Sequence, residues 1–434
     1  MKRVRVIGAG LAGCEAAWSL ANRGYGVELV EQKPLHYSPA HHVPTFAELV
    51  CSNSLKAERV ESAAGLLKEE MRRLGSLCLQ AAQEARVPAG GALAVNRDIF
   101  SDRVTQAIRG HENIQVVAKV QEDLSEQIPT ILATGPLTEG AMARQLQELT
   151  GATSLSFFDA AAPIVTADSL DFSQLFAQSR YDRGGAEDYW NASFDKAGYE
   201  AFWEALVSAE TATLHDFEEN VYEGCMPIEK LAKRGKDAIR YGPMKPVGLR
   251  NPQTGHRPWA AVQLRKENEE GSLFNLVGFQ TNLKFSEQKR VFSMIPGFAN
   301  AEFARYGVMH RNSFLNAPEV LDEQLRLKKA PWVRVAGQLS GVEGYMESAA
   351  GGILAARFLA EELEGISFRP LPETTMLGAL LKYLGTPNRD FQPMGANMGL
   401  LPALAEEIKD KKDRYAAYAQ RALAALDTYL KEES

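Results

Sequence analysis

The chain has 434 residues, of which 45% are hydrophobic and 24% are charged, and its net charge is −7. This composition excludes a largely disordered protein, and the length allows two or three domains. The apolar runs are too short to span a bilayer and the N-terminus lacks the pattern of a signal peptide, so we expect a cytoplasmic protein without membrane contact.

The N-terminus predicts a nucleotide-binding βαβ unit. Residues 3–7 have the apolar character of a buried parallel strand, residues 14–23 that of a helix, and residues 27–31 that of a second strand. The loop between the first strand and the helix carries the glycine pattern of dinucleotide-binding proteins. Its candidate cofactor-binding residues are Gly8, Ala9, Gly10, Leu11, Ala12 and Gly13.

Each glycine of this loop has its own expected role. Gly8 permits the tight turn, Gly10 lets the backbone approach a pyrophosphate, and Gly13 lets the helix pack closely on the strand. The N-terminus of the helix supplies amide donors for the phosphates. Glu31, at the end of the second strand, is expected to accept hydrogen bonds from the adenosine ribose.

A polar segment around Cys51 follows the second strand. Its run Ser52-Asn53-Ser54 predicts a cap for the helix that carries Leu66. Loops at this place in a flavin domain commonly face the cofactor, but the residues alone leave Cys51 equally open to a structural and a reactive role. The four cysteines contain no CxxC pair, so the sequence predicts no metal site.

Two later segments favour FAD over NAD as the cofactor. Residues 130–135 predict a strand that ends in an Ala-Thr-Gly turn, as in flavoproteins with two dinucleotide domains, and residues 333–338 predict a strand that runs into a glycine turn before a helix. The chain has no second GxGxxG motif, so no separate NAD(P) domain is expected. The candidate cofactor-binding residues of these segments are Thr134, Gly135, Gly337, Gln338 and Gly351.

These elements predict an α/β fold with a Rossmann-like FAD-binding domain, which contains a parallel sheet, and a smaller mixed α+β insertion domain. The FAD-binding domain is expected to be discontinuous, over 1–155 and 330–365. The insertion domain is expected over 156–329, and a C-terminal helical segment over 366–434.

Charge is unevenly distributed within the insertion. Residues 185–224 hold ten acids and one base, a net charge of −9, whereas residues 226–266 hold ten bases and two acids, a net charge of +8. The basic segment can form an anion-binding face, or the two segments can pair with each other on a solvated surface. Cys225 precedes a short helix expected to begin at 226 or 227. Because a helix N-terminus and neighbouring bases stabilise a thiolate, a reactive role is favoured for Cys225.

Several segments together resemble the folate- and flavin-dependent tRNA uracil-5-methyltransferases, often called TrmFO. The resemblance covers nearly the whole chain, and the segments after residue 220 are more specific than the glycine pattern. The segments that carry it are 8–17, 49–55, 223–227, 240–249, 275–281 and 306–312.

The resemblance implies methylation of C5 of the uridine at position 54 in the T-loop of tRNA. The carbon would come from 5,10-methylenetetrahydrofolate, and reduced FAD, regenerated by NADH or NADPH, would supply two electrons. Family roles make Cys225 the nucleophile that adds to C6 of the base, with Cys51 assisting near the flavin, as the base that removes the C5 proton. The residues that would hold tRNA phosphates are Lys230, Lys233, Arg234 and Lys245.

Two other functions stay open. The related flavoproteins that modify the wobble uridine share the turn at 341–345. These relatives carry a longer C-terminal domain, which counts against wobble-uridine modification as the function of this chain. They also form a complex with a GTPase. The other alternative is a flavoprotein that binds RNA without catalysis. No obligate protein partner is expected from the sequence.

Overall fold

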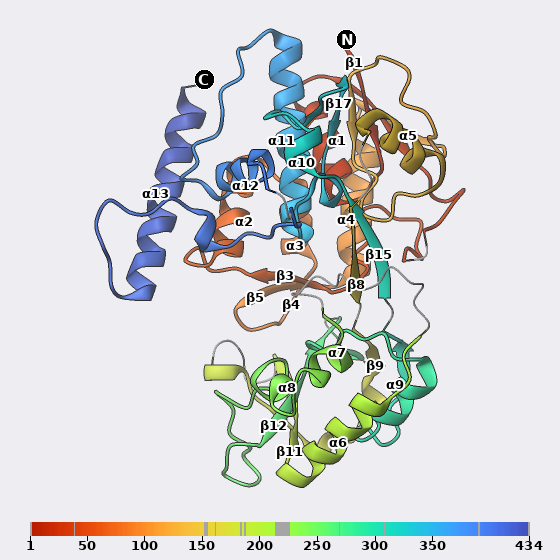
Figure 1. Ribbon diagram of the computed structural model, residues 1–434, viewed down its shortest axis with the longest axis vertical. Coiled ribbons are helices and arrows are strands. Elements are labelled where there is room, and N and C mark those ends of the chain that lie inside the picture. The colour runs from red at the N-terminus through yellow and green to blue at the C-terminus, as the bar shows by residue number, and fades with distance from the viewer. Residues whose placement is uncertain are drawn as a thin grey trace.

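The chain folds into two lobes in the computed structural model (Figure 1). The upper one, here called the nucleotide lobe, contains the described ends of the chain and most of the helices, and the lower one, the insertion lobe, contains α6, α7, α8 and α9. The structure describes residues 2–38, 40–151, 155–160, 162–182, 185, 188–212, 226–268, 270–307, 309–388 and 391–432.

A six-stranded sheet forms the centre of the nucleotide lobe, in the order β16-β17-β7-β1-β2-β6. All neighbouring strands are parallel except the pair β16 and β17. The predicted α/β fold with a parallel, Rossmann-like sheet is therefore confirmed. The strands are β1 (Arg3–Ile7), β2 (Gly26–Glu31), β6 (Ile114–Ala118), β7 (Thr130–Leu132), β16 (Arg326–Leu327) and β17 (Ala330–Val335).

Helices cover this sheet, and a small three-stranded sheet, in the order β3-β5-β4, extends the lobe toward the insertion. The three strands are β3 (Ser54–Ala57), β4 (Arg86–Val87) and β5 (Ala92–Val95). The helices are α1 (Leu11–Asn22), α2 (Ala63–Arg73), α3 (Leu77–Glu84), α4 (Arg97–Gly110), α5 (Gly140–Thr150), α10 (Ala317–Val320), α11 (Tyr345–Glu364), α12 (Met376–Gly385) and α13 (Lys411–Lys431).

Three glycines bring the strands and helices of the nucleotide lobe into direct contact. Gly8 has φ +97°, and a Cβ there would lie 2.5 Å from the carbonyl oxygen of Ala133. A Cβ at Gly13 would lie 1.7 Å from the oxygen of Gly8, and one at Gly352 would lie 2.0 Å from the oxygen of Ala12. Because real Cβ atoms do not approach oxygen so closely, α1 and α11 can meet at the end of β1 only with glycine at these positions.

The insertion lobe has its own sheet and its own core. Its six strands run in the order β10-β11-β12-β13-β9-β14, with antiparallel neighbours. The buried rings of Phe202 and Phe279 lie at its centre, 6.3 Å apart. Its elements are β9 (Ile164–Thr166), β10 (Leu175–Ala177), β11 (Tyr189–Phe194), α6 (Lys196–Ser208), α7 (Ile228–Lys233), α8 (Ala238–Tyr241), β12 (Ala260–Lys266), β13 (Leu273–Leu276), α9 (Phe285–Phe292) and β14 (Phe303–Arg305).

Two long strands connect the lobes. β8 (Leu155–Ala160) and β15 (Met309–Phe314) form an antiparallel pair that runs from one lobe to the other (Figure 1). The proposed insertion domain, 156–329, lies between 1–155 and 330–365, with 366–434 as the C-terminal segment. Within these proposed bounds, α10 packs in the core of the nucleotide lobe and residues 326 and 327 pair with its sheet.

The predicted helix cap at Ser52-Asn53-Ser54 is wrong. Ser54 begins β3, and α2 begins only at Ala63, where the side chain of Ser62 accepts a hydrogen bond from the amide of Gly65 at 3.1 Å. The physical reason is that the side chains of Ser52 and Asn53 bind the insertion lobe instead, as described below.

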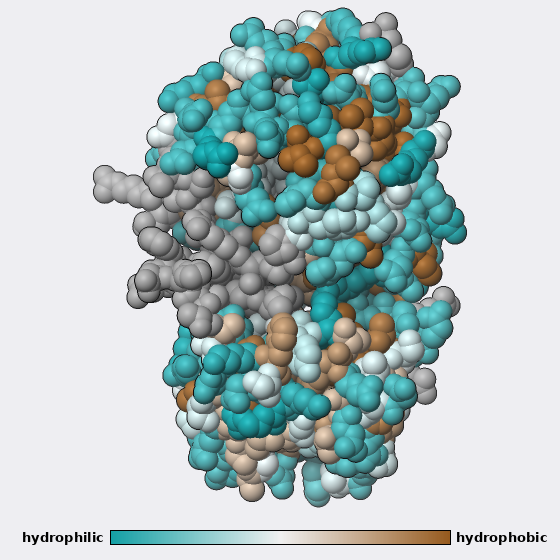
Figure 2. Space-filling view, turned by 90° about the vertical axis from the view of Figure 1, so that its right-hand side faces the viewer, coloured by the Kyte–Doolittle hydropathy of each residue, from teal (hydrophilic) through white to brown (hydrophobic). Residues whose placement is uncertain are grey.

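Among the described residues, no helix combines the length and the apolar character needed to cross a bilayer. The face shown in Figure 2 is mostly hydrophilic, and its larger hydrophobic patches lie over the nucleotide lobe.

Candidate active site

A cavity of about 920 Å³ opens where the parallel strands of the nucleotide lobe end. Residues at the carboxyl ends of β1, β2, β7 and β17 line it, which is the usual ligand site of an open α/β sheet. Gln280, from the insertion lobe, and Asn312, on the connecting strand β15, also line it. The cavity is therefore built by both lobes.

One end of the cavity is formed mainly by backbone. Gly8, Gly10, Leu11 and Ala12 line it, and no atom lies within 4 Å of the position that a Cβ on Gly10 would take. This open space beside the N-terminus of α1 is what a closely approaching phosphate requires.

The carboxylate of Glu31 is fixed at the same end. Its two oxygens accept hydrogen bonds from the amides of Ala9, at 2.6 Å, and Lys33, at 2.9 Å. Glu31 is buried and lines the cavity. Ala9 and Gly13, both predicted to bind the cofactor, do not line the cavity. Ala9 binds Glu31 through its amide, and Gly13 packs against Gly8.

The strand ends of β7 and β17 complete the wall. Thr134 and Gly135 line the cavity after β7, and Gly337 and Gln338 line it after β17. Gln338 donates a hydrogen bond to the carboxylate of Glu343 at 2.7 Å.

Gly351 does not line the cavity, although the sequence predicted that it binds the cofactor. It lies on α11, where a Cβ would be 3.2 Å from the amide nitrogen of Gly337. The neighbouring Gly352 makes the tighter contact, with α1. The sequence does not distinguish the two glycines, because they are adjacent in the same helix.

These features fit a flavin dinucleotide. Gly10 and the N-terminus of α1 provide the phosphate site, Glu31 the ribose site, and the N-terminus of α11, with Gly344 and Tyr345, lines the opposite part of the cavity. The cavity volume lies near the upper end of the range of about 300–1,000 Å³ for small-molecule sites. The part of the chain that the structure describes has no cluster of three metal-ligating side chains.

Cys51 lies in the cavity wall, half-buried, beside Tyr345 at the start of α11. The thiol sulfur and the Tyr345 hydroxyl oxygen are 2.9 Å apart. The amides of Cys51 and Ser52 both donate to this oxygen, at 2.8 and 3.2 Å, which leaves the hydroxyl hydrogen to point at the sulfur. Burial, together with the nearby Cys51, raises the pKa of Tyr345 well above its usual value, so the hydroxyl keeps its proton.

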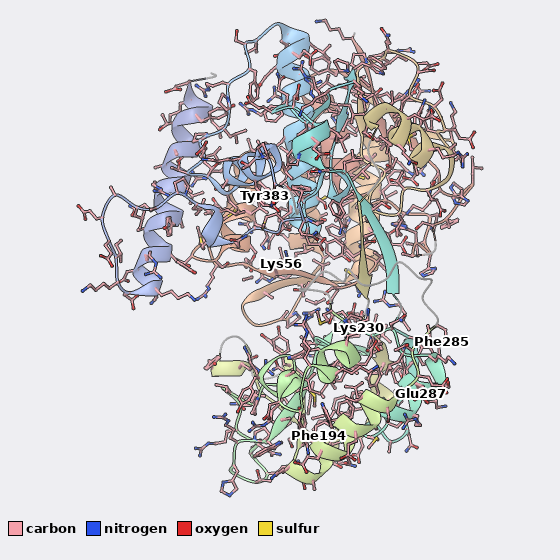
Figure 3. All side chains as sticks on the ribbon, in the orientation of Figure 1. Lys56, Phe194, Lys230, Phe285, Glu287 and Tyr383 are labelled. Atoms are coloured by element: carbon pink, nitrogen blue, oxygen red, sulfur yellow. The ribbon has the colours of Figure 1, made fainter. Side chains whose placement is uncertain are left out.

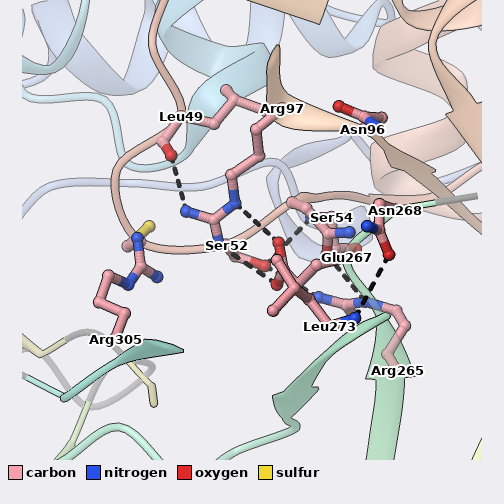
Figure 4. Close-up of polar contacts among 12 residues, drawn as sticks. Leu49, Ser52, Ser54, Asn96, Arg97, Arg265, Glu267, Asn268, Leu273 and Arg305 are labelled. Atoms are coloured by element: carbon pink, nitrogen blue, oxygen red, sulfur yellow. Dashed lines mark hydrogen bonds and ion pairs between the residues drawn. The ribbon is translucent and has the colours of Figure 1, made fainter. Parts of the chain in front are cut away.

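Three arginines hold the segment 49–54, here called the thiol loop (Figure 4). Arg97 donates to the carbonyl oxygen of Leu49 at 2.8 Å, and Arg305 donates to that of Val50 at 3.0 Å. Arg265 donates to the side chains of Asn53, at 3.0 Å, and Ser52, at 3.1 Å. Arg265 and Arg305 belong to the insertion lobe, so this lobe fixes a loop of the nucleotide lobe.

A buried carboxylate pairs with one of these arginines. Glu267 is 5% exposed and pairs with Arg97, whose Nε lies 2.8 Å from its Oε2. Burial acts to lower the pKa of Arg97, but the charge and hydrogen bond of Glu267, together with Tyr345 and Cys51, outweigh burial and raise that pKa. No carboxylate among the described residues forms an ion pair with Arg305, and burial, followed by the charge of Arg97, lowers its pKa to about 10. The guanidinium groups of Arg97 and Arg305 both interact electrostatically with the thiol of Cys51.

Within the insertion lobe, α7 holds the segment that carries Gln280. The amide of Ile228 donates to the carbonyl oxygen of Gln280 at 2.7 Å, and the buried Glu229 accepts from the Thr281 hydroxyl and the Asn282 amide, both at 2.8 Å. Burial raises the pKa of Glu229. α7 begins one or two residues later than predicted. Cys225, the predicted nucleophile, lies outside the described residues, three positions before α7.

The predicted RNA-binding residues lie on and after α7. Lys230 and Lys245 are half-buried, whereas Lys233 and Arg234 are exposed. Figure 3 shows Lys230 on the side of the insertion lobe that faces the nucleotide lobe, opposite Lys56. Among the described residues of the acidic segment 185–224 and the basic segment 226–266, Glu200 and Lys236 form an ion pair at 3.2 Å. Part of the basic charge is therefore neutralised within the lobe.

Known proteins are similar to this chain in sequence. The model of the family described as glucose inhibited division protein A matches residues 3–367. The methylenetetrahydrofolate–tRNA-(uracil-5-)-methyltransferase TrmFO of Acetivibrio thermocellus is 52% identical over 99% of both chains, and the protein of the same name from Geobacter sulfurreducens is 53% identical over 98% of both. The chain belongs to the TrmFO family.

A solved structure supports the fold of this TrmFO family member. GidA of Aquifex aeolicus superposes with a TM-score of 0.68 over 98% of this chain and 73% of the GidA chain. The two sequences are 15% identical, so this likeness concerns the fold alone.

Proposed function

We propose that this chain methylates C5 of a uridine in tRNA, with 5,10-methylenetetrahydrofolate as the carbon donor. The names of its relatives state this reaction, and the identity of about one half extends over the full length of both chains. The structural observation that carries the proposal is the position of Cys51, a half-buried thiol in the wall of a dinucleotide-sized cavity, 2.9 Å from the Tyr345 hydroxyl oxygen. We further propose position 54 in the T-loop as the target and the cytoplasm as the compartment.

FAD is the cofactor that the cavity fits. Gly10 and the N-terminus of α1 would hold its phosphates, Glu31 its ribose, and Gly337, Gln338 and the N-terminus of α11 its flavin half. When bound, FAD supplies the two electrons that convert a methylene carbon into a methyl group. NADH or NADPH is the proposed source of these electrons, and a transient site would serve for it because the sequence has no second nucleotide motif.

The protein's thiols activate the base in this proposal. Uracil C5 is a weak nucleophile until a thiolate adds to C6, and we assign this addition to Cys225. After the carbon has been transferred, the C5 proton must leave so that the bond between Cys225 and C6 can break. Cys51 would take this proton, and the Tyr345 hydroxyl, which points at its sulfur, would hold the thiolate in place.

The RNA would be held through its phosphates. The target base must leave the loop stack to reach the cavity, and such extrusion costs a few kcal/mol. Lys233 and Lys245 are candidates to contact the backbone, in a manner that depends on salt but not on sequence. Removing one of them should reduce the salt slope of tRNA binding by about one unit and leave the flavin content unchanged. A tRNA affinity that hardly changes between low and physiological salt would contradict this surface.

A single assay distinguishes the proposed reactions. The FAD-loaded protein is incubated with unmodified tRNA, methylenetetrahydrofolate and NADH or NADPH, and the modified nucleosides are mapped by mass spectrometry. Methylation of the T-loop uridine is expected. A modification at the wobble position would identify the related wobble-uridine enzymes instead, and binding without any modification would identify a non-catalytic RNA-binding flavoprotein.

A further inference from the structure

Three aromatic rings form a column at the edge of the insertion lobe. The ring of Tyr306 lies 4.9 Å from that of Phe303 and 4.7 Å from that of Phe285, with interplanar angles of 13° and 17°. Phe303 in turn contacts the buried Phe292, at 6.4 Å. The column therefore extends from the core of the lobe to its surface, where Phe285 is the last ring.

The outer ring is open to solvent. Phe285 is 55% exposed although one of its faces lies on Tyr306, so its other face is available for contact. Parallel stacking is unusual inside this lobe, where the contacts of Phe172 with Trp190 and of Phe279 with Phe292 are edge-on, at 74° and 70°. A nearly parallel column with a free outer face is the arrangement onto which a planar ring can add.

The residues of the column are near in sequence to residues that line the cavity. Gln280, which lines the cavity, precedes Phe285 by five residues, and Asn312, which also lines it, follows Tyr306 by six. A fully extended chain would place these pairs at most about 18 and 22 Å apart. Figure 3 shows Phe285 on the upper part of the insertion lobe, near the end of β15.

The segment that carries the outer ring is weakly basic. Residues 284–290 hold three cations and one acid, and Glu210, which pairs with Lys284, brings the local net charge to +1. Lys284 pairs with Glu210 at 2.5 Å and Arg290 with Glu287 at 2.6 Å, while Lys289 is exposed on the same helix. Cations beside a free aromatic face are the combination that single-stranded nucleic acid recognises, through its phosphates and its bases.

We propose that Phe285 is a stacking platform for an unpaired nucleobase of the RNA substrate, outside the cavity that receives the base to be modified. The proposal rests on the proposed function, because it takes RNA as the partner. Phe303 and Tyr306 support the outer ring, and the base adds to the column as its fourth ring. Loss of one base–aromatic stack weakens binding by about fivefold to a hundredfold.

The test uses the FAD-loaded full chain and unmodified tRNA. Phe285→Ala and Phe285→Leu should both weaken the tRNA Kd and raise KM by about fivefold or more, with kcat within about twofold of wild type. Phe285→Trp should retain wild-type affinity because it keeps an aromatic face. Ile366→Ala is the matched control, since Ile366 is a 54% exposed apolar side chain on the nucleotide lobe. Flavin content and Tm should be unchanged in all four.

Three results would overturn the platform. Wild-type Kd in Phe285→Ala would show that the ring does not touch RNA. Wild-type Kd in Phe285→Leu would show that apolar contact, not stacking, is what matters. A change of oligomeric mass in Phe285→Ala without RNA would assign the ring to a contact between proteins. The proposed function fails separately, if the wild type binds tRNA through Phe285 but methylates nothing.

Discussion

The two ends of the cavity are built by different means. At the Gly10 end, a continuous βαβ unit presents backbone amides, and its close packing depends on glycines at 8 and 13. At the Cys51 end, side chains hold the thiol loop, and the residues that meet there are far apart in sequence: Arg265 is 212 positions from Asn53. The first end is a property of local sequence, and the second exists only after both lobes have folded against each other.

This difference separates binding from reactivity. A cofactor site made of backbone needs no particular side chains beyond Glu31 and the glycines, so it tolerates change elsewhere in the chain. The thiol loop is held by Arg97, Arg265 and Arg305. Two of these arginines belong to the insertion lobe, and the third pairs with Glu267 of that lobe. Changes at the Cys51 end should therefore reduce catalysis and leave the flavin in place, while changes at the Gly10 end should first affect the flavin.

The largest effect is expected from the thiols. Cys51→Ala and Cys225→Ala should each reduce methyl transfer to below about a thousandth of the wild-type rate, with FAD content unchanged. RNA with 5-fluorouracil in its T-loop should form a covalent adduct with the wild type and with Cys51→Ala but not with Cys225→Ala, as read by mass spectrometry. An adduct on Cys51 would reverse the two roles. Cys78→Ala, at a fully buried thiol, is the control that should stay active.

The next effect tests the side-chain network. Glu267→Gln removes the charge opposite Arg97 and should lower the free energy of unfolding by about 3–5 kcal/mol. It should also slow methyl transfer by up to about a hundredfold, because the thiol loop loses its fixed position. Glu373→Gln, at the exposed pair with Lys382, should change stability by less than about 1 kcal/mol. Unaltered catalysis in a folded Glu267→Gln protein would mean that the network does not position Cys51.

The Gly10 end is tested through its carboxylate. Glu31→Ala should weaken FAD binding, because the ribose loses up to two charge-assisted hydrogen bonds worth about 1.5–3 kcal/mol each. Folding should suffer less, since the amides of Ala9 and Lys33 can turn to water or to the ligand. Flavin titration of the apoprotein gives the Kd, and full occupancy with unchanged affinity would refute the ribose role.

The smallest effect compares adjacent glycines. Gly352→Ala should lower the free energy of unfolding by about 1–3 kcal/mol, because its Cβ would overlap the carbonyl oxygen of Ala12. Gly351→Ala, with 3.2 Å to its nearest neighbour, should be nearly neutral, since alanine favours the helix by up to about 1 kcal/mol. Denaturant unfolding of the two variants measures the difference, and equal values would show that α1 and α11 can move apart without cost.

The Gly10 end of the cavity could be predicted from the sequence, whereas the Cys51 end could not. The strands at 3–7 and 27–31 and the roles of Gly8 and Gly13 could be read from the sequence because the contacts that define them are local. The thiol loop could not, because the partners of Asn53 are in the other lobe and no local pattern indicates them.

Two further residues of the site illustrate the same limit. Tyr345 had a signal in its position after a glycine turn at a helix start, but its contact with Cys51 spans 294 positions. Gln280 lines the cavity, and the segment that follows it is held by Glu229, about 50 positions earlier in the chain. Both depend on tertiary contacts that the local pattern does not determine.

The bond between Arg265 and Asn53 also limits how such enzymes can be recombined. A chimera that takes its insertion lobe from one relative and its nucleotide lobe from another would bring together an arginine and a loop that were not selected with each other. The smallest unit that can be exchanged intact is therefore the insertion lobe together with residues 49–54 and Arg97, three separate stretches of the gene. A substitution of Arg265 and one of Asn53 that each reduce activity alone should be tolerated together when the two new side chains can bond to each other.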